Sequence, residues 1–179
     1  KKEDNINKIF FIDKKNNLEK DLKIDFEYIL LIHETGIQKS YGWEWENDDQ
    51  IVNLHMDLLI KTIIGILKNR KINNQEIKLV IKAHPSDQTY LLKEKIYETN
   101  FKDFIFINKF NSFEYIEKAL MIFGIGSKLL FNSALINSNT YSLKLNQGCF
   151  YPFTEEIPYI KLLRSEFELN YVLRKYLNK

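Results

Sequence analysis

The sequence contains a series of short, largely apolar runs, separated by longer amphipathic stretches. Each run has the length of a β-strand and is bounded by polar or turn-forming residues. Runs of this kind indicate strands that are buried on both faces, as in a parallel sheet. We expect strands at 28–32, 77–81, 104–107, 120–123 and 140–145. A further apolar patch at 9–12 is either a strand or an entry segment.

The stretches between these runs have helical periodicity. Residues 51–68 carry an apolar face of Val52, Met56, Leu59, Ile63 and Ile66/Leu67, and Asp49 is placed to cap this helix. Further helices are predicted from Ser86 to about 99, from Asn111 to 119 with a capping-box-like start, over 127–136 and over 162–177.

Alternating strands and helices favour an α/β fold in which helices cover both faces of a parallel sheet. Right-handed crossovers then give a Rossmann-like layer structure. We predict an N-terminal segment (1–27), a Rossmann-like domain (28–161) and a C-terminal helix (162–179) that packs on it.

The composition excludes several classes of protein. The chain has 179 residues and a formal net charge of +2 with both signs mixed, which argues against a nucleic-acid partner. Its one cysteine rules out an internal disulfide, and no apolar run approaches the ~18 residues of a membrane span. We therefore expect a cytoplasmic protein, with peripheral attachment to the inner membrane through a segment outside this sequence left open.

The first candidate site follows the strand at 77–81. His84 and Pro85 lie at its carboxyl end, where open α/β sheets bind ligands. Imidazole can donate a hydrogen bond to a phosphate oxygen, and Ser86 begins a helix whose exposed N–H groups favour anions. Lys82 is either a phosphate contact or a solvated edge lysine. The alternative for His84 is a capping turn that happens to contain histidine.

The second candidate site follows the strand at 120–123. Gly124 and Gly126 allow close approach of the backbone to a ligand, and Ser127 offers both a hydroxyl and a helix cap. Lys128 lies in the first helical turn, where a cation is unfavourable unless an anion is bound. The same passage also occurs as ordinary turn chemistry, and it has neither Walker nor G-x-G-x-x-G spacing.

The long loop at 33–50 is the third candidate, because it leaves the first strand at the same edge of the sheet. Glu34 and Glu44 are the acid–base candidates, and the nearby Trp43 and Trp45 could stack on a sugar or a base. The alternative is an aromatic patch against another domain. His55 is expected to be structural, and the three histidines lack metal-ligand spacing, so we expect neither a metal nor a cofactor.

Lys82-Ala83-His84-Pro85 and Gly126-Ser127-Lys128 resemble motifs of bacterial GT-B glycosyltransferases that use CMP-sugars, namely sialyltransferases, polysialyltransferases and Kdo-type capsule transferases. Those enzymes carry Lys-Pro-His-Pro and a later Ser-Ser or Ser-Thr. Here Ala83 replaces the first proline, and Lys128 replaces the second hydroxyl residue. A related likeness, to glycerophosphate or ribitol phosphate transferases of teichoic-acid synthesis, depends on the same His-Pro-Ser-Asp stretch.

The resemblance implies that the Rossmann-like domain at 28–161 is the donor-binding half of a GT-B fold. It also implies that His84 contacts the donor phosphate and assists departure of CMP, and that Ser127 binds the same phosphate. The general base would come from an acceptor-side domain. It predicts an inverting, metal-independent glycosyltransferase that moves a sialic-acid-type sugar from a CMP donor to a surface glycan. Its partners would be the nucleotide-sugar donor, the glycan acceptor and an acceptor domain or partner subunit. Two alternatives stay open: a non-catalytic nucleotide- or glycan-binding module or subunit, and a GT-B-type UDP-sugar epimerase.

Overall fold

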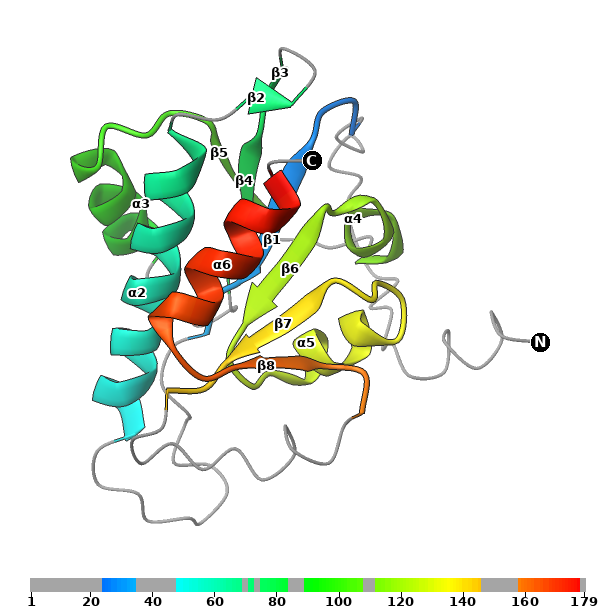
Figure 1. Cartoon of the computed structure of the whole chain (residues 1–179). Helices are drawn as coiled ribbons and strands as arrows, with labels where there is room; N and C mark the ends of the chain where they lie inside the picture. The colour runs from blue at the N-terminus through cyan, green and yellow to red at the C-terminus, as the bar shows by residue number, and fades with distance from the viewer. Residues whose placement is uncertain are drawn as a thin grey trace, which may run out of the picture.

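Six parallel strands form the centre of the fold (Figure 1). The computed structural model describes residues 24–34, 48–68, 71–72, 75–83, 89–107, 112–145 and 158–177. The strands are β1 (Tyr28–Ile32), β4 (Lys78–Lys82), β5 (Phe104–Ile107), β6 (Met121–Gly124), β7 (Thr140–Leu143) and β8 (Lys161–Leu163). They lie in the order β5-β4-β1-β6-β7-β8, and every neighbouring pair is parallel. The predicted Rossmann-like α/β fold is therefore confirmed.

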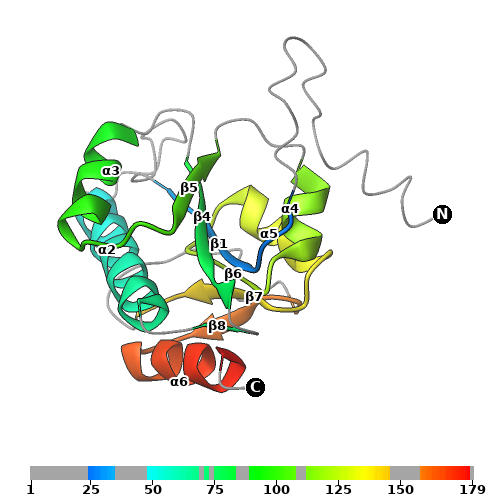
Figure 2. The same ribbon diagram turned by 90° about the horizontal axis from the view of Figure 1, so that it is seen from above.

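Five helices among the described residues cover both faces of this sheet (Figure 2). They are α2 (Asp48–Leu67), α3 (Thr89–Glu98), α4 (Ser112–Lys118), α5 (Lys128–Ala134) and α6 (Glu166–Leu177). Side chains of α2, α3 and α6 join one core cluster, and side chains of α4 and α5 join the other. On α6, Leu169, Leu173 and Leu177 repeat every four residues and are buried, as expected for an amphipathic helix.

The central strand β1 shows why the apolar runs are continuous. Ile29 and Leu31 point into the cluster under α2 and α6, and Tyr28, Leu30 and Ile32 point into the cluster under α4 and α5. All five residues are buried. Full burial of an aliphatic side chain of this size contributes about 1.5–3 kcal/mol, so β1 is the part of the sheet that burial stabilises most.

The structure differs from the predicted elements in three places. Helix α2 begins at Asp48, so Asp49 lies inside it and is not its cap. The segment predicted as the start of the terminal helix is strand β8, and α6 begins only at Glu166. A small antiparallel pair, β2 (Lys71–Ile72) and β3 (Gln75–Glu76), was not predicted. The apolar patch at 9–12 lies outside the described residues.

The strand order fixes where a ligand would bind. Numbered along the chain within the main sheet, the order is 3-2-1-4-5-6, with the reversal between β1 and β6. Ligands of open α/β sheets bind outside the carboxyl ends of the strands at this reversal. A pocket shared by the two sequence motifs implies that the strand before His84 (β4) and the strand before Ser127 (β6) are neighbours. In the structure they are not, because β1 lies between them.

Candidate functional site

Glu34 lies at the reversal between β1 and β6. It follows β1 by two residues, and its carboxylate accepts hydrogen bonds from the backbone of the β6–α5 turn. The donors are the N–H groups of Ile125 (3.4 Å), Gly126 (3.1 and 3.3 Å to the two oxygens) and Ser127 (2.8 Å). The structure thus brings together two candidate sites that the sequence suggested separately.

Burial raises the pKa of the Glu34 carboxyl above its ordinary value, and the hydrogen bonds from Ser127, Gly126 and Ile125 oppose this rise only in part. The protonated form therefore persists to higher pH than in an exposed glutamate. A carboxyl group that can hold a proton nearer to neutral pH is suited to general acid–base chemistry.

The turn that holds Glu34 is shaped by Ser127 and Gly124. Ser127 is the N-cap of α5, as predicted, and its Oγ accepts from the Leu130 N–H at 3.2 Å. A Cβ on Gly124 would lie 3.1 Å from both methyl carbons of Leu130 and 3.4 Å from the Ile32 carbonyl oxygen. Glycine at 124 therefore lets α5 pack closely against β6 and β1. The close approach at this position is made by the protein's own residues.

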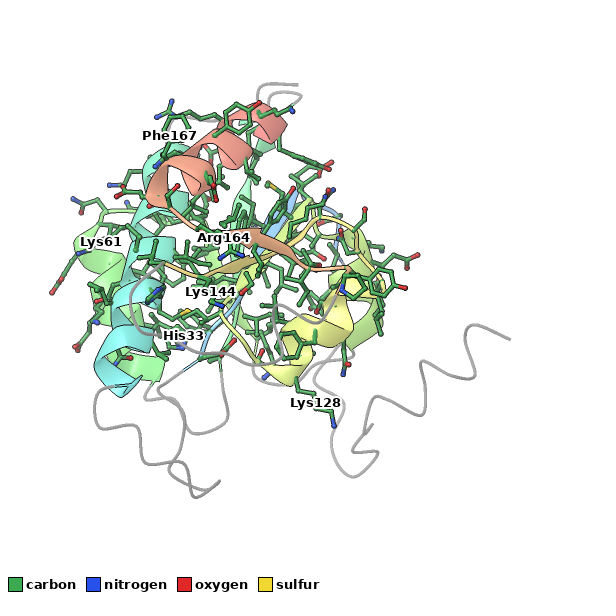
Figure 3. The ribbon with its side chains drawn as sticks, turned by 60° about the horizontal axis from the view of Figure 1, so that its bottom comes forward. His33, Lys61, Lys128, Lys144, Arg164 and Phe167 are labelled. Atoms are coloured by element: carbon green, nitrogen blue, oxygen red, sulfur yellow. The ribbon has the colours of Figure 1, made fainter. Side chains whose placement is uncertain are left out.

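The lysines of the two motifs lie at different places on this edge. Lys82 ends β4, next to β1, and its Nζ donates to the Ala83 carbonyl at 2.9 Å. Lys128 is exposed and extends from the start of α5 away from the body of the domain (Figure 3). Lys82 therefore lies one strand away from the reversal, whereas Lys128 follows the turn at the reversal but its side chain extends outward.

Several predicted site residues lie outside the described residues: His84, Pro85, Ser86, Glu44, Trp43 and Trp45. The roles expected for them stay predictions. The strand end that leads to His84 is in place, because the His33 N–H donates to the Lys82 carbonyl at 2.9 Å and holds the carboxyl ends of β1 and β4 together.

His55 has the structural place expected for it. It is 2% exposed on α2, and its Nε2 accepts a hydrogen bond from the Leu145 N–H at 3.2 Å. This contact fixes the chain just after β7. Among the described residues, no three His, Cys, Asp or Glu side chains lie together in a way that could hold a metal ion.

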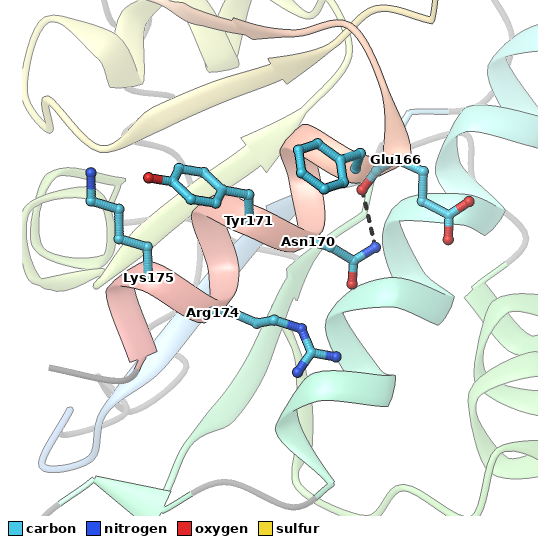
Figure 4. A pocket seen from close by; sticks show the side chains of 6 residues that line it. Glu166, Asn170, Tyr171, Arg174 and Lys175 are labelled. Carbon is cyan, nitrogen blue, oxygen red and sulfur yellow. Dashed lines mark hydrogen bonds between the residues drawn. The ribbon is translucent and has the colours of Figure 1, made fainter.

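One hollow in the described part of the chain is formed by a single helix. About 670 Å³ of space lies on the outer face of α6, between Glu166, Phe167, Asn170, Tyr171, Arg174 and Lys175 (Figure 4). All six residues belong to one helix, so the hollow is an open surface feature and does not enclose a ligand. The strand ends at the reversal are the stronger candidate site, because several elements converge there.

None of the helices in the described part of the chain combines the length and the apolar character needed to cross a bilayer.

Comparison with known proteins gives a fold and no family. No protein-family model matches the sequence, and the search of curated proteins finds no match. Among solved structures, the chain is similar to the Methanocaldococcus jannaschii UDP-GlcNAc 2-epimerase, determined in complex with UDP-GlcNAc and UDP. The TM-score is 0.51 at 15% identity, over 87% of this chain and 39% of that one.

It is also similar to S. aureus MnaA, determined with UDP, with a TM-score of 0.55 at 13% identity, over 93% of this chain and 40% of that one. The chain therefore spans about two-fifths of the length of these proteins. At such identities the likeness shows the fold alone, which is a Rossmann-like α/β fold of the GT-B-like kind.

Proposed function

We propose that this chain is the nucleotide-binding domain of an enzyme that acts on a nucleotide-sugar, and that it binds the nucleotide at the carboxyl ends of β4, β1 and β6. The single observation that carries the proposal is the position of Glu34. A carboxylate bound by three consecutive amides lies at the strand-order reversal, where folds of this kind take their ligands.

In this proposal the phosphate is held mainly by side-chain cations and imidazole. The amides of Gly126 and Ser127 already donate to Glu34, so a phosphate would reach them only by displacing a carboxylate. Lys82 and, as the sequence predicts, His84 with Pro85 and Ser86 supply contacts at the neighbouring strand end. Glu34 then serves as the group that takes or gives a proton at the sugar.

We place a UDP-sugar first as the substrate class. The corresponding reaction is the epimerisation of a UDP-sugar, which is one of the alternatives left open in the sequence analysis. The support is that the two similar structures described above were both determined with UDP. Because the chain spans only part of their length, the proposed enzyme includes a second domain or subunit that completes the site.

A CMP-sugar transferase that acts on a surface glycan is the second candidate. It is favoured by Lys82-Ala83-His84-Pro85 together with Gly126-Ser127, which resemble motifs of CMP-sugar-using enzymes. In that case Glu34 or Glu44 would act on the acceptor hydroxyl, and His84 would assist departure of the nucleotide.

Thermal unfolding of the chain with UDP or with CMP tests the proposal. Nucleotide at a hundredfold excess over Kd stabilises the folded state by about 2.7 kcal/mol, a rise in Tm of roughly 5–10 °C for a domain of this size. Stabilisation by UDP supports the first candidate, and stabilisation by CMP alone supports the second. Absence of a shift with either nucleotide contradicts the proposal.

Variants locate the binding site. Lys82→Ala and His84→Ala should each reduce the shift, and Lys61→Ala should leave it unchanged, because Lys61 is an exposed residue of α2 away from the strand ends (Figure 3). A shift that all three variants retain would place nucleotide binding elsewhere.

A further inference from the structure

Two basic residues lie side by side at the carboxyl ends of the last two strands. Lys144 directly follows β7, and Arg164 directly follows β8. The strands pair in parallel with Leu143 opposite Leu163, so Lys144 and Arg164 occupy the next position in register. The Lys144 N–H donates to the Leu163 carbonyl at 2.8 Å, which extends the ladder beyond the strand ends.

The backbone that carries Lys144 is fixed on both sides. The N–H of Leu145 donates to His55 Nε2 at 3.2 Å, and the Ser142 Oγ donates to the Ile125 carbonyl. Ser142 and Lys144 are two residues apart, so strand alternation puts them on the same face. Lys144 therefore emerges next to the β6–α5 turn that holds Glu34, on an anchored backbone.

Like charges at in-register positions of neighbouring strands repel each other. An anion bound between Lys144 and Arg164 would attract both side chains and offset this repulsion. A guanidinium beside an ammonium suits a phosphate or a carboxylate, because the guanidinium fork can bind two oxygens at once. Among the described residues, Glu168 contacts Arg164 directly, since its Oε2 accepts from the Arg164 N–H at 2.6 Å. Glu34 binds the β6–α5 turn, which Ser142 also contacts. Both basic side chains also interact within the chain, so an incoming anion would compete with those contacts.

The pair lies at a fixed place relative to the proposed nucleotide site. Along the sheet, β7 is two strand spacings from β1 and β8 is three, which corresponds to about 10 and 14 Å. In Figure 3, where the bottom of the molecule comes forward, His33, Lys144 and Arg164 are labelled near one another. An extended nucleotide-sugar bound at β1 and β6 can reach this far.

We infer that Lys144 and Arg164 form a subsite for the second anionic group of the substrate, the group beyond the phosphate attached to the nucleoside. The inference rests on the proposed function and narrows its substrate to nucleotide-sugars with two anionic groups. These are the second phosphate of a UDP-sugar or the carboxylate of an acidic sugar linked to CMP.

Calorimetric titration of the wild-type chain and of the double variant Lys144→Ala/Arg164→Ala tests this inference. The probes are UMP, UDP, CMP and CMP-N-acetylneuraminate. The double variant should lose roughly 10- to 100-fold in affinity for the probe with the second anionic group, and little for its one-phosphate counterpart. A loss confined to UDP identifies a diphosphate, and a loss confined to the CMP-linked acidic sugar identifies a carboxylate.

The matched control is Lys61→Ala/Arg174→Ala, which removes the same two residue types from exposed positions on α2 and α6. It should leave every affinity unchanged. Circular dichroism and urea unfolding establish that each variant is folded, and Lys144→Arg/Arg164→Lys should restore most of the affinity because it keeps both charges.

Inorganic pyrophosphate separates failure of this inference from failure of the proposed function. One outcome is that the ratio of affinities for UDP and UMP, and the ratio for CMP-N-acetylneuraminate and CMP, are the same in the double variant as in the wild-type chain. In that case the subsite is refuted and nucleotide binding stands. If no nucleotide binds but pyrophosphate binds through Lys144 and Arg164, the anion subsite stands and the proposed function fails. If the wild-type chain binds neither, both are refuted.

Discussion

Replacement of Glu34 gives the most direct test of the site, because this one side chain joins the end of β1 to the β6–α5 turn. Glu34→Ala removes the acceptor for three amides, and Glu34→Gln keeps one oxygen acceptor but cannot carry a negative charge. Comparison of the two variants separates the hydrogen bonds from the charge.

The structure sets the expected magnitude. The contact from Ile125 is long at 3.4 Å and contributes little, so the loss comes mainly from the N–H groups of Gly126 and Ser127. A buried donor that loses its acceptor costs about 1–3 kcal/mol, and these two partly exposed residues can recover some of that from water. We expect a loss of about 2 kcal/mol in the free energy of unfolding for Glu34→Ala, and less than about 1 kcal/mol for Glu34→Gln.

The pH dependence carries the sharper test. Burial raises the pKa of Glu34 in the folded chain, so the folded state binds more protons than the unfolded state between the two pKa values. The contribution of Glu34 to the wild-type free energy of unfolding should therefore fall as the pH rises from the ordinary glutamate pKa through the raised one. Glu34→Gln lacks this dependence, so its deficit relative to wild type should be largest at low pH and should shrink as the pH rises.

Urea unfolding followed by far-UV circular dichroism, at a series of pH values from about 4 to 8 that brackets the glutamate pKa, measures this difference. If the deficit of Glu34→Gln grows with pH, then the amide hydrogen bonds outweigh burial, and the pKa of Glu34 is lowered. That result would refute Glu34 as a proton carrier and leave it as a fixed carboxylate that only joins the two strand ends.

The remaining predictions concern packing and buried polar groups. Gly124→Ala should destabilise the chain by about 1–3 kcal/mol, because its Cβ would lie 3.1 Å from Leu130. The matched Gly65→Ala should stabilise the chain by about 0.5–1 kcal/mol, because nothing lies within 4 Å of that exposed helical position. Urea unfolding that gives both changes the same sign would contradict this explanation. Asn137→Ala should cost about 2–4 kcal/mol, because the amide donates to the carbonyls of Ile116 (2.9 Å) and Ala119 (2.8 Å) and accepts from the Asn139 N–H. The exposed Asn170→Ala should cost less than about 0.5 kcal/mol in the same assay, and equal losses at the two positions would show that the buried contacts contribute little.

Much of the sheet could be predicted from local sequence because its strands are buried on both faces. The apolar run at 104–107 coincides with β5, and the run at 28–32 coincides with β1. Ser127 was also predictable as a cap, because a serine before a helical pattern has one common use. In each case the physical cause acts within a few residues of the chain.

Strand β8 could not be found in this way. Leu162 and Leu163 fit the helical spacing of Leu169 and Leu173, so the pattern predicts one continuous helix. Pairing with β7 decides the outcome, because the edge of the sheet offers hydrogen bonds to the backbone of 161–163 that a helix would not use. The contact of Glu34 with Ser127 spans 93 residues and has no local signal at all.

The strand order also changes what kind of ligand the two sequence motifs can share. Strands β4 and β6 are separated by β1, which puts their carboxyl ends about 10 Å apart. If His84 and Ser127 hold the same phosphate, as the resemblance implies, their side chains must therefore reach toward each other across the end of β1. A nucleotide-sugar is long enough to cross that distance, and the side chain in the middle of its path is Glu34. In the proposed function, an extended ligand spans this interruption and its reacting sugar lies near the Glu34 carboxylate.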